Sequence, residues 1–163
     1  MSEILRVTEV EHYTDTLFRI RTERPNTYRF TAGEFTMIGM GDDDINRAYS
    51  ITSGPYDEYL EFYSIKVPDG PLTSRLQHIQ VGDTLEVGTP KGRFVYNPEI
   101  DSETTIVAFA AGSGITPIMS IAQTVLETKT DTRFVLIYGN KSPKETIFYD
   151  AILKLKTLYN DRF

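Results

Sequence analysis

The chain has 163 residues, 40% of them apolar and 12% aromatic, so it is long and apolar enough to bury a core and is expected to be globular. Its 17 basic and 23 acidic residues give a net charge of −6, which argues against nucleic acid as the main partner, because phosphate backbones select basic surfaces. The lack of cysteine excludes disulfides, thiolate nucleophiles and Cys-ligated iron-sulfur clusters within this chain.

Metal and membrane proteins are also disfavoured. The two histidines, His12 and His78, are too few and too far apart in the sequence to indicate a zinc site. No apolar run approaches the roughly 18 residues of a membrane span, and the first residues carry acids where a secretory signal needs a basic start. We therefore expect a cytoplasmic protein with neither a bound metal nor a membrane partner.

Up to Gly92 the sequence is typical of an antiparallel barrel or sandwich. Short β-branched and aromatic runs are broken by Gly, Pro and Asp at fairly regular spacing. The alternation of Leu60, Phe62 and Ser64 with their neighbours indicates a half-buried strand. The predicted strands cover residues 4–11, 17–22, 34–40, 47–50, 59–66 and 84–87, and residues 72–79 are expected to form a short helix.

From Thr104 onward the period changes to that of a β-α-β-α unit. Residues 106–111 form one buried strand and residues 134–138 another. Thr116 and Pro117 are predicted to cap the first helix as its N-cap and first residue. The apolar positions of the two helices are Ile118, Ile121, Ala122, Val125 and Leu126 in the first, and Ile147, Phe148, Ala151, Ile152, Leu155 and Leu158 in the second.

The polar segment 97–103 is the expected boundary between two domains. The predicted fold is an antiparallel β-barrel over residues 1–100, followed by a partial α/β, Rossmann-like domain with a parallel sheet over residues 101–163. The last residues resemble the approach to a third strand, and parallel sheets are normally larger than two strands and covered on both faces. The second domain is therefore expected to be incomplete.

Residues 47–53, Arg-Ala-Tyr-Ser-Ile-Thr-Ser, form the first motif with chemical meaning. A bound flavin needs a cation for its pyrophosphate, an aromatic plane for its isoalloxazine ring and a small hydroxyl near N5. Arg47 and Tyr49 point the same way if this segment is a strand. Taken alone, the motif is equally compatible with an ordinary barrel strand that carries a surface arginine and a packed tyrosine.

In residues 63–76, the second motif, a strand ends in a turn that opens a helix rich in hydroxyl groups. Free N–H groups at a helix N-terminus bind phosphate, and Lys66, Thr73 and Ser74 are placed to add side-chain contacts. A turn followed by a capped helix, with no ligand, is the alternative interpretation.

The third motif, Gly-Ser-Gly-Ile-Thr-Pro at residues 112–117, lies between a buried strand and a helix, as a dinucleotide-binding loop does. It fits the usual NAD fingerprint poorly. Pro117 replaces the last small residue, and the end of the next strand, Tyr-Gly-Asn-Lys at 138–141, carries no acid. A generic nucleotide loop is the alternative.

Together, in this order and spacing, the motifs resemble the ferredoxin-NADP reductase superfamily. The resemblance rests on the three motifs, on Gly-Asp before the strand at 84–87, and on Pro-Lys-Gly-Arg-Phe at residues 90–94. Residues 1–90 are most similar to bacterial ferredoxin/flavodoxin-NADP reductases. Residues 110–141 are closer to the reductase components of phenylacetate-type and aromatic-ring oxygenases.

The resemblance implies an FAD-dependent oxidoreductase. Arg47 would hold the FAD pyrophosphate, while Tyr49 and Ser50 would be the catalytic residues, one stacked on the flavin and the other hydrogen-bonded near N5. Ser113 and Thr116 would lie where the nicotinamide of NAD(P)H meets the flavin. The full set of expected cofactor-binding residues is Arg47, Ala48, Tyr49, Ser50, Tyr63, Ser64, Ile65, Lys66, Gly70, Pro71, Leu72, Thr73, Ser74, Ser113, Thr116, Asn140 and Lys141.

Lys141 gives NADPH a mild preference over NADH, because a lysine there can meet the extra phosphate and no acid is present to bind a ribose diol. The expected electron acceptor is a small acidic protein, ferredoxin or flavodoxin, or an oxygenase component. Arg75, Lys91 and Arg93 would dock it, although an ordinary solubilising surface explains them equally well. Residues 42–44, three aspartates, are interpreted as a solvated loop and not as a metal site.

Two other hypotheses stay open from the sequence. The chain could be an FAD-binding module without turnover, because half of the expected nicotinamide domain is missing. Alternatively, the barrel could bind a different ligand, as small barrels do in many unrelated proteins.

Overall fold

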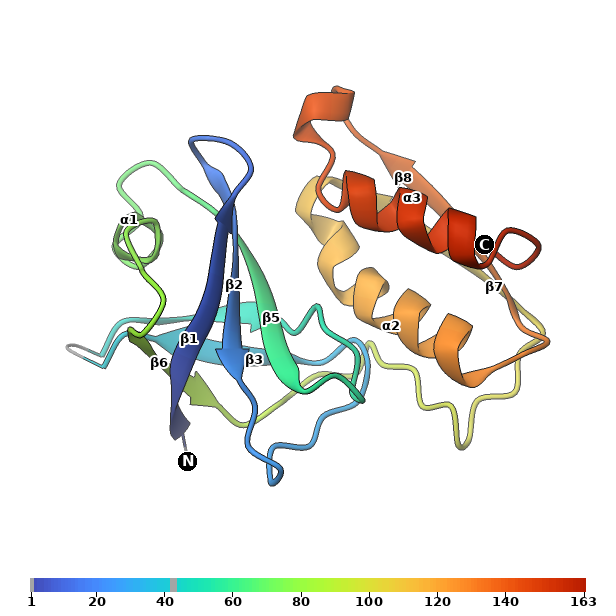
Figure 1. Ribbon diagram of the computed structural model, residues 1–163, viewed down its shortest axis with the longest axis horizontal. Coiled ribbons are helices and arrows are strands. Elements are labelled where there is room, and N and C mark those ends of the chain that lie inside the picture. The colour runs from blue at the N-terminus through green and yellow to red at the C-terminus, as the bar shows by residue number, and fades with distance from the viewer. Residues whose placement is uncertain (1, 42–43) are drawn as a thin grey trace.

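The computed structural model of the protein describes residues 2–41 and 44–163 and places an antiparallel barrel beside a smaller α/β part (Figure 1). Each predicted barrel strand is present, with ends that differ from the prediction by at most two residues. Of the predicted acidic loop, Asp42 and Asp43 lie outside the described residues. The barrel comprises β1 Ser2–His12, β2 Leu17–Glu23, β3 Phe35–Gly39, β4 Asn46–Ser50, β5 Tyr59–Ile65, β6 Thr84–Gly88 and the helical turn α1 Thr73–Leu76.

The six strands form one antiparallel sheet in the order β4-β3-β6-β1-β2-β5. The long strand β1 pairs with β6 over Ser2 to Arg6 and then, after an irregularity between Val7 and Glu9, with β2. Such a bulge bends a strand and lets the sheet curl. The two end strands, β4 and β5, meet at a seam where the N–H of Thr52 donates to the carbonyl of Glu61 at 2.9 Å. The barrel is thus nearly closed.

Strand β5 shows the predicted alternation, with one exception. Leu60, Phe62 and Ser64 are buried, and Ile65 at the strand's end is exposed. Glu61, expected on the outer face, is only 5% exposed because it pairs with Arg19 and Arg21 on the adjacent strand. A charged residue can be buried on the outside of the barrel when oppositely charged side chains cover it.

The predicted helix at residues 72–79 is wrong in its length, since α1 has a single turn. Beyond Leu76 the N–H groups of His78 and Ile79 donate to carbonyls three residues back, at 3.0 and 3.2 Å, which tightens the chain into turns. The apolar side chains of this segment, Leu72, Leu76 and Ile79, are nevertheless buried against the barrel core.

The α/β part contains β7 Thr105–Ala111, the 3-10 turn η1 Gly112–Gly114, α2 Ile115–Thr128, β8 Arg133–Gly139, a second 3-10 turn η2 Pro143–Glu145 and α3 Tyr149–Leu158. The two strands pair in parallel, from Thr105 opposite Arg133 to Ala111 opposite Gly139. Both helices lie on one face of this small sheet (Figure 1). Its other face leaves Val107, Phe109 and Ile137 exposed. None of the described helices is both long and apolar enough to span a bilayer.

The predicted start of α2 is wrong. The helix begins at Ile115 after η1, with Gly114 as its N-cap, so Thr116 and Pro117 lie inside its first turn. The Thr116 hydroxyl donates to the carbonyl of Ser113 at 3.0 Å and does not cap an N–H group. Pro117 costs no hydrogen bond at its position, because the first N–H groups of a helix have no partner within it.

The second helix also begins later than its apolar pattern predicts. Ile147 and Phe148 precede α3, and Phe148 has left-handed backbone angles, φ 63° and ψ 20°, so it cannot belong to the helix. Both residues are buried, as predicted. Leu158, expected to be buried, is 62% exposed at the helix end.

The barrel and the α/β part share a hydrophobic cluster in which Leu17, Ala32 and Tyr96 of the barrel pack with residues of α2. One buried hydrogen bond crosses this contact, from the Ser120 hydroxyl to the carbonyl of Ser53 at 2.7 Å. The shared cluster fixes the loop after β7 relative to the barrel seam.

Gly33 is expected to be irreplaceable in this contact. Its φ is +97°, and a Cβ there would overlap the carbonyl oxygen of Phe94 and lie 3.1 Å from Ile121 of α2. We expect Gly33→Ala to lower the free energy of unfolding by about 3 kcal/mol in urea denaturation. Gly82→Ala is the matched control, because Gly82 has φ +98° with no atom within 4 Å, and it should cost only about 1 kcal/mol. Equal losses would show that the overlap has no effect.

Candidate functional site

A cavity of about 640 Å³ opens where the barrel seam meets the α/β part, and we call it the seam cavity. Its lining comes from β4, from β5 and the turn that follows, and from η1, the first turn of α2 and the segment before α3 in the α/β part. The residues are Arg47, Ala48, Tyr49, Ser50, Tyr63, Ile65, Val67, Pro68, Asp69, Gly70, Pro71, Leu72, Thr73, Ser113, Thr116 and Ile147. Segments more than 60 residues apart thus meet in one site.

All four residues of Arg-Ala-Tyr-Ser line the seam cavity. Strand β4 is an end strand of the described sheet, so a ligand can approach it along its edge as well as across its face. Arg47 is exposed and donates from Nη1 to the carbonyl of Asn46 at 2.7 Å. Among the side chains that line the cavity, Arg47 has the only permanent positive charge.

The Tyr49 side chain is held across the seam. Its hydroxyl lies 3.1 Å from the Ser64 hydroxyl on β5, and its ring packs against the barrel core. Burial raises the pKa of the Tyr49 phenol above its usual value, and the Ser64 hydrogen bond offsets part of this rise. Tyr49 therefore presents a neutral, fixed aromatic ring to the cavity.

The turn after β5 supplies a second wall of the cavity. The Thr73 hydroxyl accepts a hydrogen bond from the N–H of Val67 at 3.1 Å, so its own proton can still be donated to a ligand. Gly70 makes this closure possible, because a Cβ at that position would overlap the Thr73 oxygen. Asp69 turns the chain with a positive φ of 55°. With only one helical turn in α1, this wall acts through hydroxyl and backbone groups and not through a helix dipole.

Three residues of the α/β part complete the seam cavity: Ser113, Thr116 and Ile147. Ser113 and Thr116 lie at the carboxyl end of β7, and the hydroxyl of Tyr138 at the end of β8 donates to the carbonyl of Gly112 at 2.9 Å. In α/β folds, ligands bind in the crevice beyond the carboxyl ends of the strands. This edge of the small sheet faces the barrel seam.

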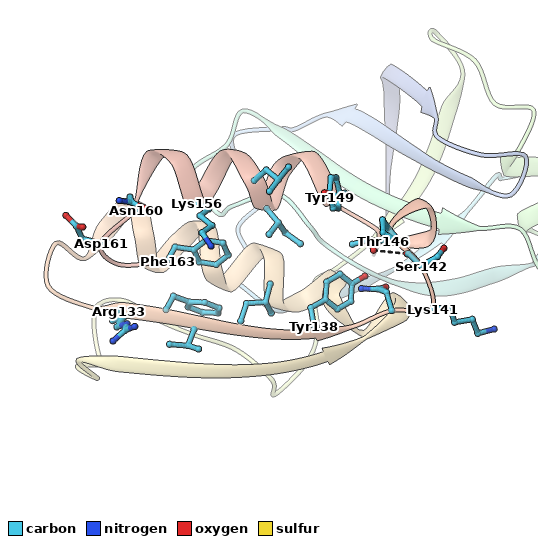
Figure 2. A pocket seen from close by; sticks show the side chains of 17 residues that line it. Arg133, Tyr138, Lys141, Ser142, Thr146, Tyr149, Lys156, Asn160, Asp161 and Phe163 are labelled. Atoms are coloured by element: carbon cyan, nitrogen blue, oxygen red, sulfur yellow. Dashed lines mark hydrogen bonds between the residues drawn. The ribbon is translucent and has the colours of Figure 1, made fainter.

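Asn140 and Lys141 lie elsewhere, in a second cavity of about 640 Å³ between β8 and α3. Figure 2 shows this cavity, with Tyr138 and Lys141 near one end and Asp161 and Phe163 near the other. A hydrogen bond from the Thr146 hydroxyl to the Ser142 carbonyl, 3.1 Å long, shapes the loop beside Lys141. The carboxyl ends of β7 and β8 lie side by side, because Ala111 pairs with Gly139 there.

Most of the expected cofactor-binding residues therefore meet in one place, and three do not line either cavity. Ser64 is 2% exposed and lies behind Tyr49. The N–H of Lys66 donates to the carbonyl of Thr16 at 2.8 Å, and the N–H of Ser74 donates to the carbonyl of Gly70 at 3.0 Å. Contact of Lys66 and Ser74 with a cofactor stays a prediction.

Four lining residues were not among those expected: Val67, Pro68, Asp69 and Ile147. The first three lie within the second motif, so including the whole turn would have found them. Ile147 had only an apolar helix pattern as a signal, and that pattern does not indicate which cavity the residue faces.

We expect Ser64→Ala to loosen Tyr49. Losing the hydroxyl partner should lower the free energy of unfolding by about 1 kcal/mol, measured in urea. Because the Tyr49 ring would then be less restricted, any planar aromatic ligand of the seam cavity should bind a few-fold more weakly. Ser102→Ala is the control and should change neither quantity, because Ser102 is exposed and lies outside the cavity. Equal behaviour of the two variants would remove the anchoring role of Ser64.

The chemistry of the seam cavity fits a flavin dinucleotide. It offers a cation in Arg47, an aromatic plane in Tyr49, donors in Ser50 and Thr73, and a volume in the range of cofactor pockets, about 300–1,000 Å³. The adjoining sheet edge supplies a nucleotide-binding crevice. Fold and site together define a class of protein with an FAD-type barrel joined to a nicotinamide-type α/β part.

Comparison with known proteins agrees with this class. The model of the oxidoreductase FAD-binding domain matches residues 3–96, and the model of the oxidoreductase NAD-binding domain matches residues 109–163. The chain belongs to the ferredoxin-NADP reductase superfamily, which the sequence motifs predicted.

Similar individual proteins come from bacteria. The chain is 53% identical over 119 residues to a flavodoxin/ferredoxin-NADP reductase of Rhodobacter capsulatus, covering 71% of this chain and 44% of that protein. It is 40% identical over 153 residues to a ferredoxin-NADP reductase of Pseudomonas aeruginosa, covering 92% and 59%. A solved ferredoxin NADP+ reductase of Neisseria gonorrhoeae, with bound FAD and NADP, matches with a TM-score of 0.84 and 30% identity over 96% of this chain and 65% of that one. The chain thus spans about half the length of the two sequence relatives.

Proposed function

We propose that the chain binds FAD in the seam cavity and accepts hydride from NAD(P)H for transfer to a one-electron acceptor. The proposal rests on one observation: Arg47, Tyr49 and Ser50 of β4 line the same cavity as Ser113 of η1 and Thr116 of α2. A flavin in that cavity would be reached from the sheet edge where a nicotinamide nucleotide would bind. Supporting this, the three relatives described above are reductases by name, and one is solved with FAD and NADP.

Each residue then has a role in binding or orientation. The Arg47 guanidinium would neutralise the pyrophosphate through charge-assisted hydrogen bonds. Tyr49, held by Ser64, would stack on the isoalloxazine ring, and the Ser50 hydroxyl would donate near N5. Thr73, with Ala48, Tyr63, Ile65 and the turn residues Gly70, Pro71 and Leu72, would line the rest of the FAD path.

Bound FAD supplies the redox chemistry, namely two-electron uptake from NAD(P)H and single-electron release. The protein's part is orientation and exclusion of water. Ser113 and Thr116 would place the nicotinamide against the flavin, while Asn140 and Lys141 would contact the nucleotide half of NAD(P)H in the second cavity. Neither role requires a general acid or base.

The test is anaerobic stopped-flow mixing of the FAD-loaded chain with NADPH or NADH. The proposal expects the visible flavin absorbance to bleach, with NADPH giving the larger rate because Lys141 can meet its extra phosphate. Ferricyanide should then restore the absorbance. If the flavin binds and neither nucleotide bleaches it, the transfer step is refuted for this chain.

That outcome would favour the second candidate, an FAD-binding module without turnover. The observation behind it is that the chain spans only 44% and 59% of the two sequence relatives.

We further propose a ferredoxin or flavodoxin, or an oxygenase component, as the acceptor, and a division into domains at residues 97–103. Lys91 and Arg93 are exposed and can meet an acidic partner. Charge reversal at both positions should slow reduction of an added ferredoxin without changing the bleaching by NADPH. A cytoplasmic location stays a prediction from the sequence.

A further inference from the structure

Tyr63 borders two spaces in the molecule. It lines the seam cavity, and it also lines a cleft of about 600 Å³ between the barrel strands β1, β2 and β5 and the helices α2 and α3. We call this second space the interdomain cleft. Tyr63 thus belongs to the lining of both spaces.

The Tyr63 ring is clamped between two other rings. Tyr13, on the loop after β1, stacks on it at a centroid distance of 5.8 Å with planes 7° apart. Phe148 of the α/β part contacts it at 4.0 Å with a 44° tilt. The hydroxyls of Tyr13 and Tyr63 lie 3.2 Å apart. Because the single proton of Tyr13 is donated to Glu11 at 2.8 Å, Tyr63 is the donor in this pair.

Phe148 occupies an unusual conformation to make this contact. It is only 6% exposed, and its φ of 63° is an outlier for a bulky side chain. Such a conformation persists when the surrounding packing over-determines it. With this backbone conformation, two consecutive residues face different spaces. Ile147 lines the seam cavity, while Phe148 lines the interdomain cleft and lies against Tyr63.

We propose that Phe148 is a positioning residue for FAD, which sets the Tyr63 wall of the seam cavity from the α/β side. The inference rests on the proposed function and extends it. FAD binding is then a joint property of the barrel and the α/β part, because the barrel supplies Tyr13 and the α/β part supplies Phe148 to fix one wall. Without Phe148, the Tyr63 ring can turn into the interdomain cleft and join the two spaces.

The test compares Phe148→Ala with Phe148→Gly in the full 163-residue chain. Alanine removes the ring and keeps the strained backbone, whereas glycine removes the ring and relieves the strain. We expect both variants to bind FAD about tenfold more weakly, the loss expected for one aromatic pair, and to shift the visible band of the bound flavin. The glycine variant should unfold at a higher urea concentration than the alanine variant. Phe109→Ala, a phenylalanine 71% exposed on β7, is the matched control and should leave FAD affinity unchanged.

Three results decide between the alternatives. If Phe148→Gly binds FAD with the affinity and spectrum of the wild type, the positioning role is overturned and Phe148 serves packing alone. If neither Phe148 variant folds, Phe148→Leu decides, because leucine keeps most of the buried apolar volume and removes the ring contact with Tyr63: the inference predicts weaker FAD binding with a shifted flavin band, and unchanged binding overturns it. If the wild-type chain takes up no FAD, the proposed function itself fails.

Discussion

Replacing Glu61 by glutamine is expected to lower the free energy of unfolding by about 3 kcal/mol, because it leaves two arginines without their buried counter-charge. Glu61 is 5% exposed, and its Oε2 accepts from Arg21 Nε at 2.8 Å and from Arg19 Nη1 at 3.3 Å. Its Oε1 accepts from the Thr52 hydroxyl at 2.9 Å. Glutamine keeps the shape of the side chain and part of the hydrogen bonding, so the decrease in the free energy of unfolding measures the effect of the charge.

Urea denaturation of Glu61→Gln and of a control, Glu58→Gln, measures this effect. Glu58 is an exposed carboxylate three residues away, so its replacement should change stability by less than about 0.5 kcal/mol. Glu9 and Glu11 also pair with Arg19 but are half-exposed, so they cannot fully compensate. Equal stability of the two variants would show that the buried network contributes nothing.

Replacing Arg47 by alanine is expected to weaken FAD binding by about 10- to 100-fold, the loss of a charge-assisted contact of roughly 1.5–3 kcal/mol. The physical reason is that Arg47 has the only permanent positive charge in the lining of the seam cavity. Quenching of FAD fluorescence on titration with the chain gives the affinity. Because Arg47 is exposed, the wild-type affinity should also fall as salt is added.

Arg93→Ala is the control for Arg47→Ala, since Arg93 is an exposed arginine outside the seam cavity. This control shows whether a loss of FAD affinity comes from the lower positive charge of the chain or from the missing contact in the seam cavity. If the two variants bind FAD equally, the pyrophosphate role of Arg47 has no support.

Local patterns were enough to predict the barrel strands, because alternating apolar residues and Gly, Pro or Asp turns act over a few neighbouring residues. Local patterns failed where packing between distant segments determines the backbone conformation. Residues 72–79 were expected to form a short helix, yet only one helical turn forms, and tight turns follow it while Leu72 and Ile79 stay buried in the barrel core. Phe148 was expected to lie inside a helix. It instead has a left-handed backbone conformation, and its ring packs against Tyr63.

The site was predictable to the extent that its residues are contiguous in the sequence. Arg47 to Ser50 and the turn around Thr73 form motifs, and the resemblance placed them around one ligand. The position of Ile147 depends on how α3 packs against the barrel, which no local pattern encodes. The buried network of Arg19, Arg21 and Glu61 had a signal, since the arginines alternate with Phe18 and Ile20, but pairing with Glu61 requires the strand register.

Titration of the purified, flavin-free chain with FAD determines whether the seam cavity is a flavin site. We expect saturable binding of one FAD per chain, a yellow complex with the absorbance of bound flavin, and a strong loss of affinity in Tyr49→Ala, because the stacking plane is removed. A chain that takes up no FAD, or that binds it as well without the Tyr49 ring, would contradict the assignment of the seam cavity as a flavin site.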